Sequence, residues 1–240
     1  MKKKIVVTGG SGRFGSILKK MNTNYKIFFP NKKQLNILNY KSIEKYLKLV
    51  KPSIIIHLAG LSRPMKIHDT EIKKSIDLNI IGTSNMTKSC IKKNIKLIYF
   101  STNYIYPGTR GNYKETDSLL PVNNYAWSKL GGAAAVQLYK NSLILRVCMT
   151  EKPFVHKVAF ANVKNSFVYQ EKVAKILFKL INKKGVINVG GKSQSVYNFA
   201  KKYNYKIKKS FAKKMLSSNY PLKPSMNIKK LRKIIKNLTI

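Results

Sequence analysis

Short apolar runs alternate with longer amphipathic stretches through most of the chain. The apolar runs lack a polar residue at every second position, and this continuous pattern is typical of strands that are buried on both faces. The runs predict strands at 4–7, 25–29, 53–60, 95–102 and 142–147, and the amphipathic stretches predict helices at 16–21, 39–51, 77–94 and 124–139. Strands that alternate with helices indicate a parallel sheet covered on both faces.

The C-terminal part continues with fewer and shorter elements. An irregular stretch precedes a predicted helix at 170–184, a strand at 185–190, a helix at 195–203 and a basic tail. We therefore predict an α/β protein that has a Rossmann-like doubly wound parallel sheet and a small C-terminal α/β lobe. The predicted domains are 1–148 and 149–240, and we expect the strand at 185–190 to be interleaved with the sheet.

The composition is typical of a folded protein with an unusually high positive charge. The chain has 240 residues, of which 44% are hydrophobic, and a net charge of +40. A basic surface can bind nucleic acid, but 43 of the basic residues are lysines, whereas groove and phosphate recognition relies on the bidentate fork of arginine. We therefore argue against nucleic acid as a partner. Residues 172–240 contain no acidic residue, and they are the best candidate if a basic patch exists.

Apolar runs and cysteines indicate the cellular compartment of the protein. No apolar run approaches the roughly 18–20 residues that a membrane-spanning helix needs, and the apolar run behind the basic N-terminus is too short for a signal peptide. Cys90 and Cys148 lie among apolar residues and predict buried, reduced thiols. No spacing of His, Cys, Asp and Glu indicates a metal site. We expect a cytoplasmic protein without a membrane anchor, and a homodimer stays open.

A glycine-rich turn directly follows the first predicted strand and opens the first helix. In "TGGSGRFG" the glycines at positions 9, 12 and 15 have the spacing of a dinucleotide site. Gly9 would form the tight turn, Gly12 would let the pyrophosphate approach the backbone, and Gly15 would let the helix pack on the strand. Residues 1–148 therefore predict an NAD(P)-binding Rossmann domain, and residues 149–240 a small substrate-binding lobe.

The end of the second predicted strand bears on the choice of dinucleotide. Dinucleotide sites usually have an acidic residue there that binds the adenosine ribose, but this chain has "PNKKQLN". Lys33 could neutralise a 2′-phosphate, so NADP(H) is favoured and NAD(H) stays open.

Three residues predict proton-handling chemistry beside the dinucleotide. Thr102 ends a predicted strand, and Tyr125 and Lys129 lie four residues apart at the start of the next helix, where such residues share a face. A free phenol has a pKa of about 10, and a nearby ammonium favours its ionised form. Tyr125 could then exchange a proton with a substrate oxygen that the hydroxyl of Thr102 holds.

The same Tyr-x-x-x-Lys spacing occurs twice more in the chain. Tyr197/Lys201 and Tyr205/Lys209 lie in the C-terminal part, and no strand end with a hydroxyl residue precedes them. We expect these two pairs to be surface pairs.

The order of these motifs resembles that of the extended short-chain dehydrogenase/reductases, and within them the dTDP-4-dehydrorhamnose reductase (RmlD-like) branch. The resemblance rests on the glycine turn, "HLAG", "DLNIIGTSN", "FSTNYIYPG", "YKETDSLLPVNNYAWSKLGG", "LILRV" and "INVGGKSQSVYNFAKKY", and it spans nearly the whole chain. It implies that Tyr125 is the acid/base, that Lys129 is its partner and binds the ribose, and that Thr102 supplies the hydroxyl.

The resemblance also implies contacts for residues that spacing alone does not single out. It implies that Gly12, Arg13 and Phe14 touch the pyrophosphate and that Ala59 and Gly60 line the cofactor. On the substrate side, it implies that Asn103 and Tyr104 face the sugar.

The chain departs from the family pattern at four places. Asn36 stands where an aspartate usually lies beside the adenine, although an amide can still bind it. Asn103 replaces an aspartate, and Ala134 lies near a usual glutamate. The segment 147–168 looks shorter than the substrate lobe of the family, so the substrate of the reductase is not inherited with certainty.

These features predict NAD(P)H-dependent reduction of a keto group on a nucleotide-activated sugar, with Tyr125 as proton donor. An NAD-dependent nucleotide-sugar epimerase and a non-catalytic NAD(P)-binding regulatory protein stay open as alternatives. We expect His57 to be a hydrogen-bonded structural histidine and Trp127 to pack. For Arg146, a substrate phosphate and a structural ion pair are both open.

Overall fold

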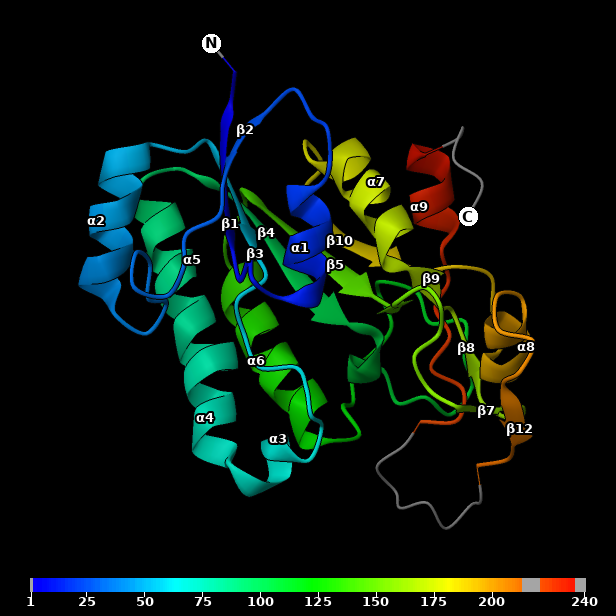
Figure 1. Cartoon of the computed structure of the whole chain (residues 1–240). Helices are drawn as coiled ribbons and strands as arrows, with labels where there is room; N and C mark the ends of the chain where they lie inside the picture. Colours follow the sequence, from blue (N-terminus) through cyan, green and yellow to red (C-terminus); the bar gives the residue numbers. More distant parts are fainter. Residues whose placement is uncertain (1, 213–220, 236–240) are drawn as a thin grey trace. The chain divides into compact units, whose positions relative to one another are not determined.

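The computed structural model describes residues 2–212 and 221–235. Its first half contains β1 (Lys4–Thr8), α1 (Arg13–Lys19), β2 (Lys26–Phe28), α2 (Tyr40–Val50), β3 (Ile54–His57), α3 (Ile67–Thr70), α4 (Ile72–Ile76), the π-helix η1 (Asp77–Ile81), α5 (Gly82–Lys92), β4 (Lys96–Thr102) and the 3-10 helix η2 (Asn103–Ile105) (Figure 1). Its second half contains α6 (Asn124–Gln137), β5 (Ser142–Val147), β6 (Met149–Thr150), β7 (Val158–Phe160), β8 (Lys164–Asn165), β9 (Val168–Tyr169), α7 (Gln170–Leu180), β10 (Gly185–Val189), β11 (Gln194–Ser195), α8 (Val196–Lys201), β12 (Lys208–Ser210) and α9 (Lys229–Ile234).

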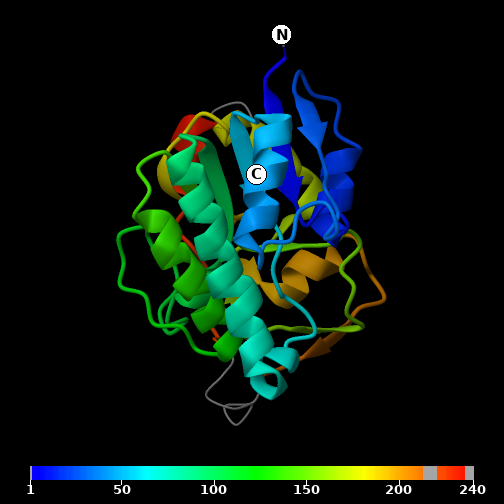
Figure 2. The same cartoon turned by 90° about the vertical axis from the view of Figure 1, so that its left-hand side faces the viewer.

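A six-stranded sheet forms the centre of the fold, in the order β10-β5-β4-β3-β1-β2. β1 pairs in parallel with both β2 and β3, and β3 pairs in parallel with β4. Helix α1 covers one face of these strands, and α2 and α5 cover the other (Figures 1 and 2). The expected doubly wound parallel sheet is confirmed.

The strand order reverses next to β1. The chain passes from β1 to β2 on one side and then returns to place β3 on the other side of β1. In open α/β sheets, ligands bind beyond the carboxyl ends of the strands at such a switch point. The glycine turn follows β1 and the predicted cofactor loop follows β3, so both segments lie at this point of the sheet.

Local sequence explains why the elements begin and end where they do. The buried strands β3 and β4 consist largely of β-branched and aromatic residues, which fit a pleated buried surface. Helix α2 begins where the side chain of Asn39 accepts a hydrogen bond from the backbone of Ser42, and it ends at Lys51 in a left-handed conformation directly before Pro52. These are ordinary start and stop signals of a helix.

The described residues divide into two compact units. Among the described residues, unit 1 comprises 2–101, 127–145 and 181–185, and unit 2 comprises 102–126, 146–180, 186–212 and 221–235. The chain therefore passes between the units several times, whereas our predicted domains have a single cut after residue 148. The strand expected at 185–190 is β10, and it joins the main sheet as predicted.

Unit 2 has a small apolar core of its own, which includes Phe154, Val163, Phe199 and Ile207. Its short strands pair two by two: β6 with β9, β7 with β12, and β8 with β11. The sequence pattern did not predict these strands or the helices α3, α4 and α9, because elements of two to six residues are too short to show a period.

Two smaller expectations were also tested. Cys90 and Cys148 are buried and not joined in a disulfide, as predicted. Among the helices that the structure describes, none has the length and apolar character required to cross a membrane.

Candidate functional site

The glycine turn in unit 1 has the geometry that a phosphate-binding turn requires. Gly9 has a φ of 70°, and a Cβ on it would lie 2.6 Å from the backbone nitrogen of Ala59. Both the left-handed conformation and the close backbone therefore require glycine at this position. A Cβ on Gly15 would lie 2.7 Å from the Gly9 carbonyl oxygen, so α1 packs directly against the turn.

The first turn of α1 is left without a side-chain cap. Its N-cap residue is Gly12, which has no side chain to accept from the helix, and the first turn holds no acidic residue. The start of α1 therefore offers the positive end of a helix dipole to an anion. Arg13 is exposed there, whereas the Phe14 side chain is buried with its ring centroid 5.1 Å from that of Phe100.

A second loop follows β3 and is fixed by Asn79. The side-chain amide of Asn79 donates to the carbonyl of Leu61 at 2.9 Å and accepts from the Leu61 N–H at 2.7 Å. It also donates to the hydroxyl of Ser128 at 2.8 Å, and it lies so near Gly60 that a Cβ there would be 2.6 Å from its oxygen. Asn79 therefore joins the predicted cofactor loop to helix α6.

His57 is a structural residue, as predicted. Its imidazole is buried, with Nδ1 2.8 Å from the Thr8 hydroxyl and Nε2 3.2 Å from the Thr83 hydroxyl. Burial, together with the positive charge of Lys129, lowers the pKa of His57 to about 3, so the ring is neutral at working pH. Thr8 in turn accepts from the Ala59 N–H at 3.2 Å, which ties the ends of β1 and β3 together.

The residues expected near the adenosine lie beyond β2. Lys33 is exposed. Asn36 is partly buried, and its side-chain oxygen accepts from the Leu38 N–H at 3.1 Å. The adenosine roles of Lys33 and Asn36 stay predictions.

Helix α6 carries Tyr125 and Lys129 one turn apart. Gly132, which follows Lys129 on this helix, lets α6 approach η1 closely. A Cβ on Gly132 would collide with the carbonyl oxygen of Asn79 and lie 2.8 Å from the Tyr99 hydroxyl. That hydroxyl donates to the carbonyl of Lys129 at 3.1 Å. The glycines of "SKLGG" are thus explained by packing.

The Lys129 side chain lies over an aromatic ring in a partly buried position. Its Nζ lies 4.2 Å from the centroid of the buried Tyr99 ring, a distance at which a cation is attracted by the ring face. Burial lowers the pKa of Lys129 to about 7, because removal from water disfavours the ammonium. A small change in surroundings can therefore change the charge of this residue near neutral pH.

The other candidate catalytic residues belong to unit 2. Thr102 ends β4, is buried, and accepts from the Tyr104 N–H at 3.3 Å. Tyr104 and Tyr125 are partly buried and meet edge to face, with ring centroids 6.5 Å apart. The strand end and the start of α6 thus contribute two neighbouring tyrosines.

Asn103 is held inside unit 2. Its amide nitrogen donates to the side chain of Asn165 at 3.0 Å and to the carbonyl of Pro224 at 3.2 Å. These bonds hold the 3-10 turn after β4 against β8 and against the segment that contains Pro224. The predicted contacts of Asn103 and Tyr104 with a substrate stay predictions.

Arg146 has structural partners within unit 2. It is buried, and its guanidinium donates to the Tyr106 hydroxyl at 2.7 Å and to the carbonyl of Glu115 at 2.9 Å. The Tyr106 ring stacks on Tyr113 with centroids 4.9 Å apart. Arg146 therefore fixes the loop that follows the strand end, and among the described residues its partners are a hydroxyl and a backbone carbonyl and not the carboxylate of an ion pair.

Two further expectations concern aromatic residues. Trp127 is 52% exposed, so the expectation that it packs was wrong, because it lies on the outer side of α6. In the pair Tyr197/Lys201 the lysine Nζ lies 5.7 Å from the ring centroid and is exposed. Tyr205 is 81% exposed. Both C-terminal pairs are surface pairs, as expected.

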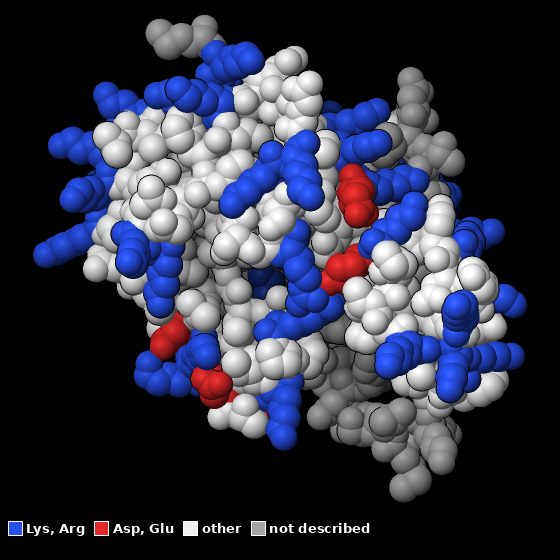
Figure 3. Space-filling view, viewed as in Figure 1, with Lys and Arg blue, Asp and Glu red and all other residues white. Residues whose placement is uncertain are grey.

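The positive charge is spread over the surface. Lys and Arg side chains occur over most of the face shown in Figure 3, and acidic side chains are few. Several acids are paired, as where Glu44 meets Lys92 and Lys93 at 3.3 and 3.2 Å. A dispersed charge of this kind increases solubility without defining one interface.

The sheet order, the glycine turn and the helix α6 define a Rossmann-like α/β protein. Residues 2–159 match the family described as RmlD substrate binding domain. This match takes in more than half of the chain, and the chain belongs to this family. The resemblance to the RmlD-like branch is thereby confirmed.

Two curated relatives are similar to part of this chain. The dTDP-4-dehydrorhamnose reductase of Aggregatibacter actinomycetemcomitans is 28% identical over 152 residues, which cover 61% of this chain and 51% of that protein. The methionine adenosyltransferase 2 subunit beta of Xenopus tropicalis is 30% identical over 156 residues, which cover 60% of this chain and 46% of that protein. The chain thus spans about half the length of the curated relatives it matches.

Solved structures agree on the fold. The dTDP-4-dehydrorhamnose reductase of Bacillus anthracis, in complex with NADP, has a TM-score of 0.86 at 24% identity and covers 100% of this chain and 95% of that chain. Bordetella bronchiseptica WbmG, in complex with NAD, has a TM-score of 0.75 at 16% identity and covers 98% and 88%. The solved structures therefore confirm the Rossmann-like fold over nearly the whole chain, whereas the family match covers residues 2–159.

Proposed function

We propose that this protein reduces a keto group on a nucleotide-activated sugar with NAD(P)H, and that Tyr125 is the proton donor. The observation that carries the proposal is Lys129, a partly buried lysine one helical turn after Tyr125 on α6, in a chain that keeps the glycine turn of its family. A lysine in that position costs desolvation energy, and function is a frequent reason for such a cost.

The glycine turn and the loop after β3 would hold the dinucleotide. The start of α1 would bind the pyrophosphate through Gly12, Arg13 and Phe14, and Ala59 and Gly60 would line the cofactor. The Bacillus anthracis structure contains NADP and the Bordetella structure NAD, and both support an NAD(P) cofactor. We favour NADP because Lys33 replaces the acidic residue that would repel a 2′-phosphate.

The chemistry of this chain's residues follows from their charges. A bound dinucleotide supplies the hydride. Tyr125 would give its proton to the sugar oxygen, which the hydroxyl of Thr102 would hold by a hydrogen bond. A free phenol has a pKa of about 10. Lowering this pKa by about three units requires that the phenolate be stabilised by about 4 kcal/mol. The ammonium of Lys129 would stabilise the phenolate and supply part of this energy.

A substrate panel tests the proposal. The purified chain is mixed with NADPH or NADH and with nucleotide keto-sugars, including the dTDP-4-dehydrorhamnose that the name of the relatives suggests. Oxidation of the cofactor that depends on one sugar is the expected result. Cofactor binding without oxidation by any sugar would contradict the reductase proposal.

A second candidate is a cofactor-binding subunit without turnover. It is supported by curated relatives of similar identity whose name is methionine adenosyltransferase 2 subunit beta. The same panel separates the two candidates, because a non-catalytic subunit would bind the dinucleotide and oxidise none of it. The presence of Thr102, Tyr125 and Lys129 together favours the reductase.

A further inference from the structure

Exposed aromatic and aliphatic side chains gather in two segments of unit 2, 152–160 and 196–212. Among the described residues, five of the fifteen large apolar side chains that are exposed belong to these segments. They are Val155, Val158, Tyr203, Tyr205 and Phe211. Tyr205 is 81% and Phe211 60% exposed, and no tyrosine or phenylalanine elsewhere in the described ranges is classed as exposed. Single exposed apolar residues are common, whereas a group of them indicates an interaction surface.

The two segments lie side by side and are joined by backbone hydrogen bonds. β7 and β12 pair in parallel, with Lys208 opposite Val158, and the N–H of Lys208 donates to the carbonyl of Lys157 at 3.0 Å. Beyond β12, the N–H of Ala212 donates to the side chain of Asn162 at 2.8 Å. The exposed residues are therefore carried by paired backbone in one region of unit 2.

Packing of the neighbouring residues directs these side chains to the solvent. Val158 precedes Ala159 on β7, and Lys208 of β12 follows Ile207. Ala159 and Ile207 are buried in the small core of unit 2. Successive side chains of an extended chain point to opposite sides, so the exposure of Val158 and Lys208 follows from the burial of their neighbours.

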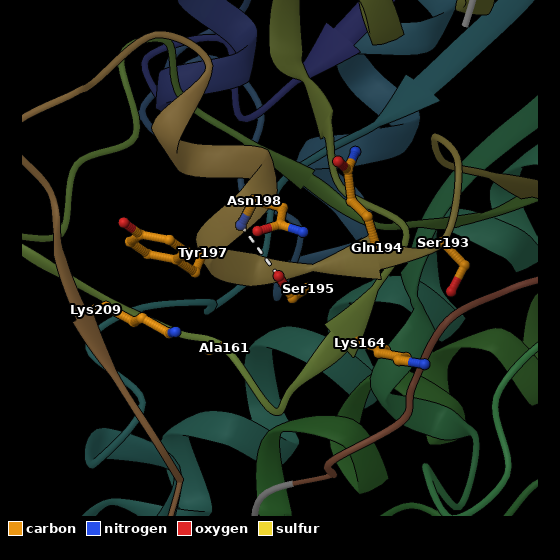
Figure 4. Close-up of a pocket in the computed structure, with 8 residues that line it drawn as sticks. All are labelled: Ala161, Lys164, Ser193, Gln194, Ser195, Tyr197, Asn198 and Lys209. Carbon is orange, nitrogen blue, oxygen red and sulfur yellow. Dashed lines mark hydrogen bonds between the residues drawn. The ribbon is translucent and has the colours of Figure 1, made fainter.

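The same segments contain lysines and no acidic residue. Together, 152–160 and 196–212 contain seven lysines and no Asp, Glu or Arg. Figure 3 shows Lys and Arg side chains over α8 and β12, with the surface of other residues between them. Lys209 lines a neighbouring pocket together with Lys164 and Ser195 (Figure 4). We define the aromatic–lysine face as the exposed residues of 152–158 and 203–211 other than Lys209.

Lysine side chains lie against the rings of this face. The Nζ of Lys152 lies 4.2 Å from the ring centroid of Tyr203, and that of Lys206 lies 6.0 Å from the ring centroid of Tyr205. Cation–π attraction holds each ammonium beside an apolar ring, and the aliphatic stem of a lysine can cover apolar surface while its charge stays in water. The face therefore presents apolar and cationic groups next to each other.

We propose that the aromatic–lysine face binds the surface of an anionic lipid bilayer. Its aromatic and aliphatic side chains would enter the boundary between headgroups and acyl chains, and its lysines would attract the anionic headgroups as point charges. Charge alone does not single out this face, since lysines occur over most of the surface in Figure 3, but the exposed apolar residues do. Such peripheral binding requires no membrane-spanning helix, and it does not depend on the reduction proposed above.

A single-stranded nucleic acid matches this face less well. Nucleic-acid surfaces rely on arginine for its planar fork and on rings that stack on bases. The face contains no arginine, and Val155 and Val158 have no ring to offer to a base. A bilayer accepts aliphatic and aromatic side chains alike and needs no particular geometry of the positive charge.

Co-sedimentation of the full chain with lipid vesicles tests the proposal. The vesicles consist of phosphatidylcholine alone or with about 30% phosphatidylserine, at about 0.15 M salt. We expect saturable binding to the anionic vesicles and none to the neutral ones. The variant K152Q/K206Q/K208Q should weaken this binding by about a hundredfold, because each lysine near an anionic surface contributes about fivefold in affinity.

The matched control removes the same charge from unit 1. Lys41, Lys45 and Lys48 are exposed on α2, and K41Q/K45Q/K48Q should weaken the binding by less than about fivefold, because charges outside the contact act only through a screened field. Equal weakening in both triple variants would mean that total charge causes the binding, and would overturn the proposal. So would equal binding to neutral vesicles, or no binding to anionic ones.

A single-stranded oligonucleotide is tested with the same variants. If it binds the parent more tightly than the anionic vesicles do, and loses more affinity in K152Q/K206Q/K208Q than in the control, the face belongs to nucleic acid and the proposal is overturned. None of these measurements contains a sugar or a dinucleotide, so their outcome and that of the reductase panel are independent.

Fluorescence tests whether the apolar residues enter the bilayer. Trp127 is the only tryptophan of the chain and belongs to unit 1. In the background Trp127→Phe, the variant Tyr205→Trp should emit at shorter wavelength when anionic vesicles are added, because its indole moves into a less polar layer. The emission of Trp127 in the parent should not move. An unchanged emission of Tyr205→Trp, or an equal shift of Trp127, would contradict insertion through this face.

Discussion

Helices α6 and α8 carry the same Tyr-x-x-x-Lys spacing in two different surroundings. On α6, Lys129 is partly buried over the Tyr99 ring, and its pKa is lowered to about 7. On α8, Lys201 is exposed and lies 5.7 Å from the ring of its own Tyr197. The spacing makes the two side chains neighbours in both cases. The packing around α6 is what changes the chemistry of the lysine.

The difference originates in residues outside the motif. Gly132 lets α6 approach η1 and Tyr99, and Asn79 holds the loop after β3 against Ser128 of the same helix. Helix α8 instead covers a small local core and leaves its lysine in water. A motif therefore acquires a function through the elements that pack on it, and three pairs of substitutions can break or sharpen this comparison.

The largest effect is expected from the two tyrosines. Tyr125→Phe should lower the rate of NAD(P)H oxidation by roughly 10²–10⁴-fold, the usual contribution of a general acid, while cofactor binding stays nearly unchanged. Tyr197→Phe makes the same chemical change on α8 and should leave the rate unaltered. Steady-state rates with the sugar found in the panel measure both variants. A Tyr125→Phe protein as fast as its parent would show that the mechanism is wrong.

Two glycines extend the comparison to the backbone. Gly9 and Gly185 both have positive φ, at 70° and 80°, but a Cβ on Gly9 meets the backbone of Ala59, whereas nothing lies within 4 Å of a Cβ on Gly185. Gly185→Ala should cost about 1 kcal/mol of unfolding free energy for the left-handed conformation alone. Gly9→Ala should cost about 2–4 kcal/mol, because the neighbouring backbone must also move, and it should abolish dinucleotide binding.

Urea denaturation of the two alanine variants provides the measurement. Equal losses of unfolding free energy in Gly9→Ala and Gly185→Ala would mean that the close approach to Ala59 does not exist in solution.

The third effect is a dependence of stability on pH. The pKa of Lys129 is about 7 in the folded chain and near 10.4 when unfolded, so between these values the unfolded state binds more protons and the stability of the parent rises with pH. Lys129→Met removes this contribution. The variant should be more stable than the parent at pH 7, and its advantage should shrink by about 1 kcal/mol per pH unit up to pH 9.

Lys201→Met makes the same chemical change at an exposed lysine and is the control. Denaturation curves at several pH values are measured for both variants. If the difference between Lys129→Met and the parent does not depend on pH, Lys129 is not desolvated.

Most of the fold could be predicted from the sequence, because long apolar runs and amphipathic stretches have clear periods. The glycine turn was predictable for a similar reason, since Gly9 and Gly15 satisfy local requirements of one strand-turn-helix unit. The stacking of Lys129 on Tyr99 was not, because the two residues lie far apart in the chain. Arg146 could not be assigned either, since its partner Tyr106 is 40 positions away. Its role became visible only once their hydrogen bond was known.

The exposure of Trp127 was not predictable, because α6 has apolar residues on most sides and its sequence does not show which side faces the solvent. In the structure Trp127 is exposed and its neighbour Ser128 is buried.

Transfer of the hydride itself tests the central proposal most directly. NAD(P)H labelled with deuterium at C4 of the nicotinamide is incubated with the chain and the sugar identified in the panel. We predict that deuterium appears at the former carbonyl carbon of the sugar, with one cofactor oxidised for each sugar reduced, and that Tyr125→Phe suppresses both. Sugar converted without net oxidation of the cofactor would indicate an epimerase. Deuterium that remains on a tightly bound cofactor with every sugar would contradict the account and favour the non-catalytic subunit.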